Sequence, residues 1–162
     1  MSKKDKIISE EQVYSCMARI CSQKEYCSYD ISQKLFRMNL PEQMREKIVN
    51  RLKADNYINE ERYVRSFVND KLRFNKWGRK KIELHLKQKQ IPQNIIESIF
   101  SEHTDSSLND HLLPLMTSKW KTIKGETEYI KTGKLIKFAL GRGFEMKDIL
   151  SCLKKMNLSD DL

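Results

Sequence analysis

The chain has 162 residues, of which 39% are hydrophobic and 33% are charged, and it carries a formal net charge of +9. Only five glycines and three prolines are present, which argues against a β protein with many turns, and the hydrophobic share argues against a disordered chain. The sequence contains no run of about 18 apolar residues. No apolar stretch follows the lysines of residues 1–6, so we expect a soluble cytoplasmic protein that does not act at a membrane.

Apolar residues at helical spacing predict three helices in the N-terminal part of the chain. The first covers residues 10–22. The second follows a polar break, and Ser28 and Asp30 supply the expected N-capping side chains. Pro41 suits the first turn of a third helix, which continues to Asn56.

The same layout of three helices recurs twice. The further helices are predicted over residues 60–74, 79–90, 95–100, 108–121, 127–140 and 145–156. The polar stretch 101–107 is the predicted linker.

The spacing of one apolar position supports a repeated unit. Leu40, Ile91 and Phe144 each join the second helix of a unit to the third, and they lie 51 and 53 residues apart. A single three-helix unit of this size cannot bury its apolar side alone and has to stack on its neighbour. We therefore predict an all-α, elongated array of three tandem three-helix repeats, over residues 9–57, 58–104 and 105–158.

No motif in the sequence favours an enzyme or a cofactor. Within residues 125–135, a phosphate-binding loop that uses Gly133 and Lys134 would need glycine at position 128, which is Glu128, and a hydroxyl at position 135, which is Leu135. The pair Gly141 and Gly143 lacks the third glycine of a dinucleotide fingerprint and is typical of a helix end. We expect no catalytic residue and no cofactor.

The cysteines and histidines do not have metal-ligand spacing. The cysteines are Cys16, Cys21, Cys27 and Cys152, and the histidines are His85, His103 and His111. No Cys-x-x-Cys or His-x-x-x-His pair occurs among them. We predict reduced thiols and no metal site.

Almost the whole charge surplus lies between Arg62 and Lys89. This stretch has ten basic and two acidic residues, so the rest of the chain is nearly neutral. Phe74 and Trp77 lie in the break between its two predicted helices, and aromatic rings among basic residues can stack on bases or enter a protein groove. The alternative, a solvated lysine-rich surface with Trp77 in the core, holds for any single lysine but fits the concentration of charge less well.

Two helices joined by a short break at Gly78 also resemble a helix-turn-helix. The side chains that would reach base edges are mostly lysines, which contact phosphates without reading sequence. Salt-sensitive contact with a nucleic acid or a nucleoprotein is therefore better supported than binding to an operator sequence.

The sequence resembles the RecX regulatory proteins in three places, which together span roughly residues 13–155. The first-repeat signature is Ser28-x-Asp30-Ile31-x-x-Lys34-Leu35, and the last-repeat signature is Lys137-Phe138-x-x-x-Arg142-Gly143-Phe144. The central signature runs from Tyr57-Ile58-Asn59-Glu60-Glu61-Arg62-Tyr63 through Ser66-Phe67-Val68, Arg73, Trp77-Gly78, Lys81-Ile82 and Leu86 to Lys89-Gln90-Ile91. The chain departs from the family pattern at Tyr26, Lys81, Gln90 and Ala139, and Gln90 replaces a glycine at a helix end.

This resemblance implies a non-enzymatic modulator of the RecA recombinase in DNA repair, recombination and the SOS response. Such a protein binds along the RecA filament on single-stranded DNA and curbs filament extension, ATP hydrolysis, strand exchange and co-protease activity. We expect a monomer whose partners are the RecA filament, single-stranded DNA and, without sequence preference, duplex DNA. The alternatives are a helical DNA-binding transcription regulator and a scaffold that binds RecA without DNA.

The predicted contact residues combine the central basic cluster with a second, smaller patch. They are Arg62, Arg65, Arg73, Lys76, Trp77, Arg79, Lys80 and Lys87, with Lys134, Lys137 and Arg142 in the second patch. Arginine and lysine would meet acidic groups or phosphates, and Trp77 would stack or anchor.

Overall fold

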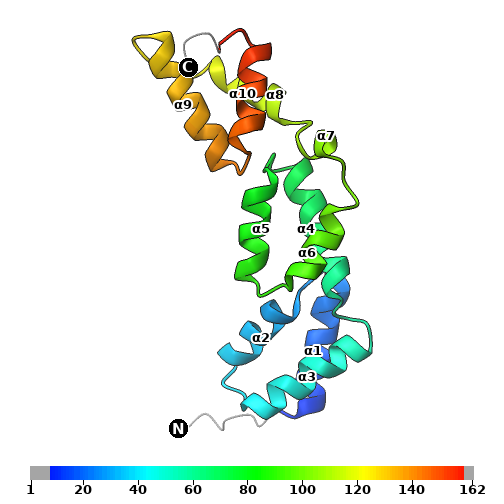
Figure 1. The fold of residues 1–162 in the computed structure, drawn as a ribbon. Helices are drawn as coiled ribbons and strands as arrows, with labels where there is room; N and C mark the ends of the chain where they lie inside the picture. The colour runs from blue at the N-terminus through cyan, green and yellow to red at the C-terminus, as the bar shows by residue number, and fades with distance from the viewer. Residues whose placement is uncertain (1–7, 159–162) are drawn as a thin grey trace, which may run out of the picture. The chain divides into compact units, whose positions relative to one another are not determined.

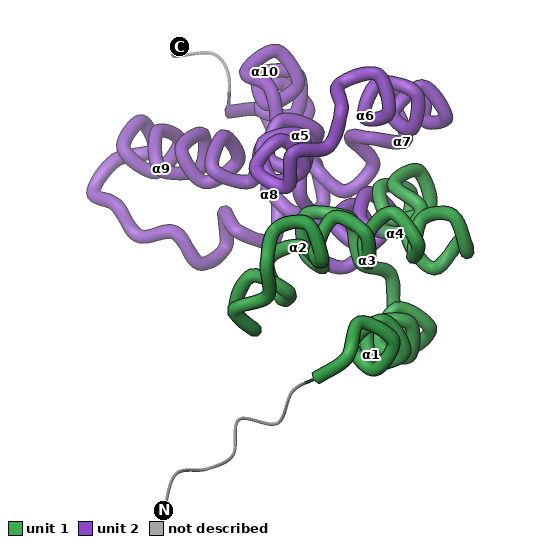
Figure 2. The backbone as a smooth tube through the Cα atoms, turned by 90° about the horizontal axis from the view of Figure 1, so that it is seen from below, with its two compact units in different colours: residues 1–66 green, residues 67–162 purple. Residues whose placement is uncertain are grey.

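The computed structural model describes residues 8–158, and helices joined by short turns make up this range without any strand. The prediction of an all-α chain is confirmed. The lysines of residues 1–6, on which the expectation of a soluble protein partly rests, lie outside the described range. Within it, no helix has the length and hydropathy needed to cross a membrane. The chain divides into two compact units, Met1–Ser66 and Phe67–Leu162 (Figure 2).

Unit 1 holds α1 (Glu10–Gln23), α2 (Ser28–Arg37), α3 (Glu42–Ala54) and the beginning of α4 (Glu60–Arg73). Helix α3 packs against both α1 and α2 (Figure 1). The fully buried side chains at their centre are Val13, Ile31, Leu35, Ile48 and Leu52. All five belong to the apolar stripes expected from the helical spacing, because each stripe is the side of the helix that leaves water.

The start of α2 differs from the prediction. Cys27 is the N-cap residue, with no side-chain cap, and Ser28 is the first helical residue. The Ser28 backbone N–H and hydroxyl instead donate to Glu60 Oε1, at 2.7 and 2.9 Å. Ser28 therefore ties α2 to the first turn of α4. The N-cap of α1 is the better example of capping chemistry, since Ser9 and Gln12 bond reciprocally in a capping box.

All four cysteines are free thiols, and three of them are buried. Burial raises the pKa of Cys21 and Cys152, and it raises the pKa of Cys27 to about 12. The thiolate is the reactive form, so a buried thiol with a raised pKa reacts slowly at neutral pH.

We therefore predict that one thiol of the native protein, Cys16, reacts readily with Ellman's reagent at pH 8. Cys16 is half-buried, whereas the other three thiols should react only after unfolding in guanidinium. The variant Cys16→Ser should lose the fast phase of the colour change. Fast reaction of more than one thiol in the native wild type would contradict the buried positions of Cys21, Cys27 and Cys152.

Unit 2 holds the end of α4 and two groups of helices. The first group is α5 (Arg79–Gln88) and α6 (Gln93–Phe100), and the second is α7 (Asp105–Leu108), α8 (Leu112–Trp120), α9 (Glu128–Gly141) and α10 (Met146–Lys155). Helices α8, α9 and α10 pack on one another (Figure 1) around Leu112, Met116, Leu135, Ile149 and Leu153.

The stretch 101–107, predicted as a linker, contains most of α7, which Thr104 caps by accepting from the Ser107 N–H. The capping side chain makes this short helix possible in an otherwise polar stretch.

One backbone turn recurs at the ends of the helices that precede the three anchor residues. Asn39, Gln90 and Gly143 come directly before Leu40, Ile91 and Phe144, and their φ values are 57°, 58° and 95°. A residue in this left-handed region ends a helix and turns the chain toward the next one. Gln90 adopts this conformation although it is not a glycine, the residue that this region of φ favours. The division into repeats 9–57, 58–104 and 105–158 remains a prediction.

Candidate interface for nucleic acid and filament

The loop between α4 and α5 is held by the turn between α9 and α10. Within unit 2, the Gly78 N–H donates to the carbonyl oxygen of Arg142 at 2.7 Å, and the Lys80 N–H donates to that of Gly143 at 3.1 Å. Arg142 Nη1 donates to the carbonyl oxygen of Asn75 at 2.8 Å. Three hydrogen bonds to backbone carbonyls therefore fix the first turn of α5 and the loop before it.

Two glycines allow this close approach. A Cβ on Gly78 would lie 2.4 Å from the carbonyl oxygen of Gly143, and a Cβ on Gly143 would lie 2.5 Å from the backbone nitrogen of Lys81. Neither backbone can retreat without breaking the hydrogen bonds just described. The sequence predicted a helix stop at Gly143 and a break at Gly78, but contact between two glycines 65 residues apart could not be inferred from it.

Four side chains form what we call the basic corner: Arg73, Phe74, Lys76 and Arg142. Lys76 Nζ donates to the carbonyl oxygen of Arg73 at 2.8 Å, and the Arg73 guanidinium lies 5.6 Å from the centre of the Phe74 ring. Arg142 reaches the same segment through Asn75. No carboxylate in residues 8–158 pairs with any of the three cations, so their positive charge remains available to a ligand.

The outer side of α5 presents a second set of cations. Lys80 and Lys87 are exposed and lie on the same side of the helix as Leu84, which is 55% exposed. Neither lysine has an ion-pair partner in the described part of the chain. An exposed leucine between two unpaired ammonium groups is suited to an acidic or phosphate-bearing surface with some apolar area.

Two of the predicted contact residues already form ion pairs within the protein. Arg79 Nε binds Glu83 Oε1 at 2.7 Å, and its guanidinium lies 4.7 Å from the ring centre of the buried Phe100. In unit 1, Arg62 pairs with Glu25 and donates to two backbone carbonyls. Both arginines therefore stabilise the fold, and their charges are largely neutralised.

Trp77 is half-buried, and cations and an imidazole surround its ring. Lys71 Nζ and Lys81 Nζ lie 4.8 and 4.5 Å from ring centres of Trp77, and the His85 ring lies at 4.7 Å. Burial lowers the pKa of His85, and the neighbouring lysines lower it further, so His85 is neutral at pH 7. The Trp77 ring is thus already contacted by an imidazole and two ammonium groups inside unit 2.

The remaining predicted residues lie apart from this cluster. Arg65 is exposed on α4 within unit 1. Lys134 and Lys137 are exposed on α9, where Lys134 Nζ donates to the carbonyl oxygen of Lys124 at 2.6 Å. The structure thus brings Arg73, Lys76 and Arg142 together at one corner, and it brings Lys80 and Lys87 onto one side of α5.

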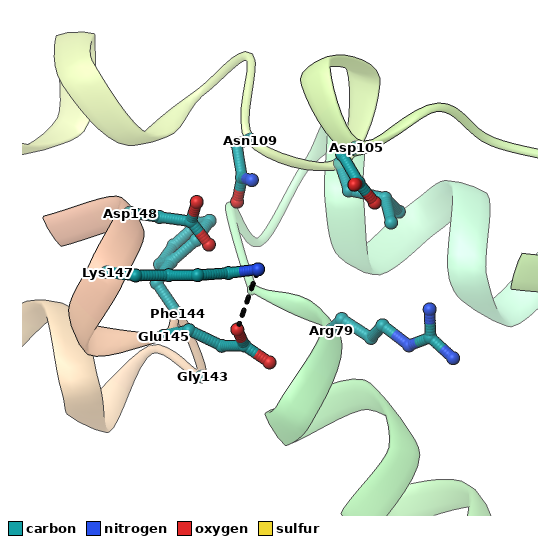
Figure 3. Close-up of a pocket in the computed structure, with 9 residues that line it drawn as sticks. Arg79, Asp105, Asn109, Gly143, Phe144, Glu145, Lys147 and Asp148 are labelled. Atoms are coloured by element: carbon teal, nitrogen blue, oxygen red, sulfur yellow. Dashed lines mark ion pairs between the residues drawn. The ribbon is translucent and has the colours of Figure 1, made fainter. Parts of the chain in front are cut away.

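A cavity of about 220 Å³ lies between the start of α5, α7 and α10 (Figure 3). Its charged lining is mixed: Asp105, Glu145 and Asp148 are acidic, Lys147 and Arg79 are basic, and Lys147 pairs with Glu145 at 3.6 Å. In the described residues no three His, Cys, Asp or Glu side chains are placed to share a metal ion. The lining is mostly polar, with Leu108 and Phe144 as its apolar side chains.

A known family model matches the central basic region of this chain. Residues 59–98 match the family model described as "RecX, second three-helix domain". A regulatory protein RecX from Chlorobium phaeobacteroides is 27% identical over 147 residues, which cover 91% of this chain and 95% of that protein. The chain is therefore similar to RecX regulatory proteins over most of its length.

Solved structures of RecX have the same fold. One crystal structure has a TM-score of 0.80 and another, from Lactobacillus salivarius, has 0.78, both at 22% sequence identity. They cover 91% and 92% of this chain, and the chain covers 72% and 97% of them. Residues 59–98, which match that family model, contain eight of the eleven predicted contact residues, among them Arg73, Lys80 and Lys87.

Proposed function

We propose that this chain is a non-enzymatic regulator of the RecX type that binds the RecA filament on single-stranded DNA. In doing so it inhibits filament extension, ATP hydrolysis, strand exchange and co-protease activity. The protein acts as a monomer in the cytoplasm and requires no cofactor. The observation that carries the proposal is the set of cations without carboxylate partners at the basic corner and on α5, within and beside the residues that match the RecX family model.

The electrostatics support a nucleoprotein as the partner. Lysine and arginine side chains release counterions when they meet phosphates, so the affinity comes largely from charge and falls with salt. An acidic protein surface beside the DNA would add to the same attraction and speed association. The exposed side of α5 carries Lys80, Leu84 and Lys87. This surface can contact both a protein and a phosphate group.

The test is RecA-dependent ATP hydrolysis on single-stranded DNA with this protein titrated in. We expect the hydrolysis rate to fall as protein is added, and we expect the concentration needed to rise steeply with salt. An unchanged rate at concentrations equal to that of RecA would contradict the proposal. Scaffold binding without DNA predicts instead that the protein binds RecA equally well whether or not a strand is present.

A helical DNA-binding transcription regulator is the second candidate, because α4 and α5 are joined by a short turn at Gly78. The first turn of α5 packs against the backbone at residues 142–143, and its exposed Lys80 is suited to phosphates. Selection from random duplexes at fixed salt separates the two candidates. One enriched, two-fold sequence would favour the transcription regulator, and no enrichment would favour the filament regulator.

A further inference from the structure

Phe74 is the most exposed large hydrophobic side chain in residues 8–158, at 71%. It is the last residue before the loop of the basic corner, and its backbone N–H still donates to the Asp70 carbonyl oxygen at 2.8 Å, in continuation of α4. The end of α4 therefore fixes the backbone of Phe74, while its ring is exposed to solvent. Exposure of a phenylalanine has a cost, and nothing within the described unit covers it.

The charges around Phe74 define what could cover it. Arg73 lies against one side of the ring, and Lys76 and Arg142 are both bonded to the backbone of residues 73–75. A partner that covers this ring must therefore have a flat, apolar group that contacts the ring. It must also carry negative charges that reach the surrounding cations. An unpaired nucleotide has this combination, with a base for the ring and phosphates for the three cations.

We propose that Phe74 is a stacking platform for one unpaired base of single-stranded DNA, with Arg73, Lys76 and Arg142 contacting the adjacent phosphates. The inference rests on the proposed function and deepens it, because it names the DNA strand as the partner of the basic corner. Duplex DNA cannot use the platform, since its bases are already stacked inside the helix. The corner thus favours single strands over duplexes without reading their sequence.

The position of the loop supports a preorganised platform. The Arg142–Asn75 hydrogen bond and the Gly78–Arg142 hydrogen bond hold the loop from the side of α9. Trp77 cannot replace Phe74 in this role, because His85, Lys71 and Lys81 occupy its ring. Binding a base at Phe74 therefore requires no ordering of the loop, which lowers the cost of association.

The test measures the affinity of the full-length protein for labelled oligo-dT and for a duplex of equal length by fluorescence anisotropy, without RecA. Phe74→Ala should weaken binding to oligo-dT about 5- to 150-fold, the range measured for loss of one base–aromatic stack, and should leave duplex binding unchanged. Phe74→Leu should lose the same affinity, because it keeps apolar area but has no π-face. Phe74→Trp should keep the affinity, and its added fluorescence should be quenched by oligo-dT.

The matched control is Phe36, which is 60% exposed and also has an arginine over its ring, with Arg45 at 5.2 Å. Phe36→Ala should leave binding to oligo-dT unchanged. The stacking proposal is overturned if Phe74→Ala binds oligo-dT like the wild type, if Phe74→Leu does, if single strands and duplexes lose affinity equally, or if wild-type protein does not bind oligo-dT. Each of these results leaves the proposed function standing as long as wild-type protein inhibits RecA-dependent ATP hydrolysis, which is measured separately.

Discussion

Reversing three exposed charges, in the variant Arg73→Glu, Lys80→Glu, Lys87→Glu, should weaken binding to RecA filaments on single-stranded DNA about 10- to 100-fold. An exposed ion pair contributes about 0.5 kcal/mol, and reversal replaces attraction by repulsion at three sites. None of these side chains is buried or paired with a carboxylate in the described residues, so the fold should persist. The salt dependence of binding should also decrease, by about two units of the log–log slope.

A second triple variant, Arg37→Glu, Lys47→Glu, Lys53→Glu, controls for net charge. It removes the same charge from exposed positions of α2 and α3 in unit 1, and within residues 8–158 none of the three side chains pairs with a carboxylate. Arg37 and Lys53 lie in the last turn of their helices, as Arg73 and Lys87 do, so the cost to the helix dipoles is similar. We expect this control to keep nearly wild-type affinity. Equal weakening in both variants would mean that overall charge, and not the surface of unit 2, drives binding.

Gly143→Ala should destabilise unit 2 by about 3 kcal/mol. The new Cβ would meet the Lys81 backbone nitrogen at 2.5 Å, and φ of +95° is strained for any residue with a side chain. Relief requires the turn to move away from α5, which breaks the hydrogen bonds to Gly78 and Lys80, worth about 1 kcal/mol each. Urea unfolding followed by circular dichroism measures the loss.

Gly133→Ala is the matched control, because it adds the same methyl group to α9. Nothing lies within 4 Å of a Cβ at this position, and the residue is in the middle of the helix. The substitution should therefore stabilise the protein by about 0.5–1 kcal/mol. If Gly143→Ala were as stable as Gly133→Ala, the contact between the α9–α10 turn and α5 would not exist in solution.

The helical spacing of apolar residues predicted most of the helices, because the side chains at these positions are the ones that are buried. The stripes at Ile31, Leu35, Ile82 and Leu86 are all buried, and helix ends were placed within a few residues. Capping was harder to predict, since it depends on which of several neighbouring polar residues the chain places outside the helix. Ser28 was expected to cap α2 but lies inside it, because Glu60, 32 residues away, binds its N–H.

The sequence located the charge but could not show which cations are unpaired. The pairing of Arg79 with Glu83 has i,i+4 spacing and was readable from the sequence, whereas Arg62 pairs with Glu25 across 37 residues. The exposure of Phe74 and Trp77 could not be predicted from the sequence either. Composition could not distinguish Trp77 from Phe74, because exposure depends on how the loop packs.

The most direct test of the account compares inhibition of RecA-dependent ATP hydrolysis by three proteins: the wild type, the unit 2 charge-reversal variant and the unit 1 control. The account predicts that the wild type and the control inhibit at the same concentrations, and that the variant carrying Arg73→Glu, Lys80→Glu and Lys87→Glu needs at least about ten times more protein. Inhibition by that variant at wild-type concentrations would contradict the claim that the unpaired cations of unit 2 carry the regulation.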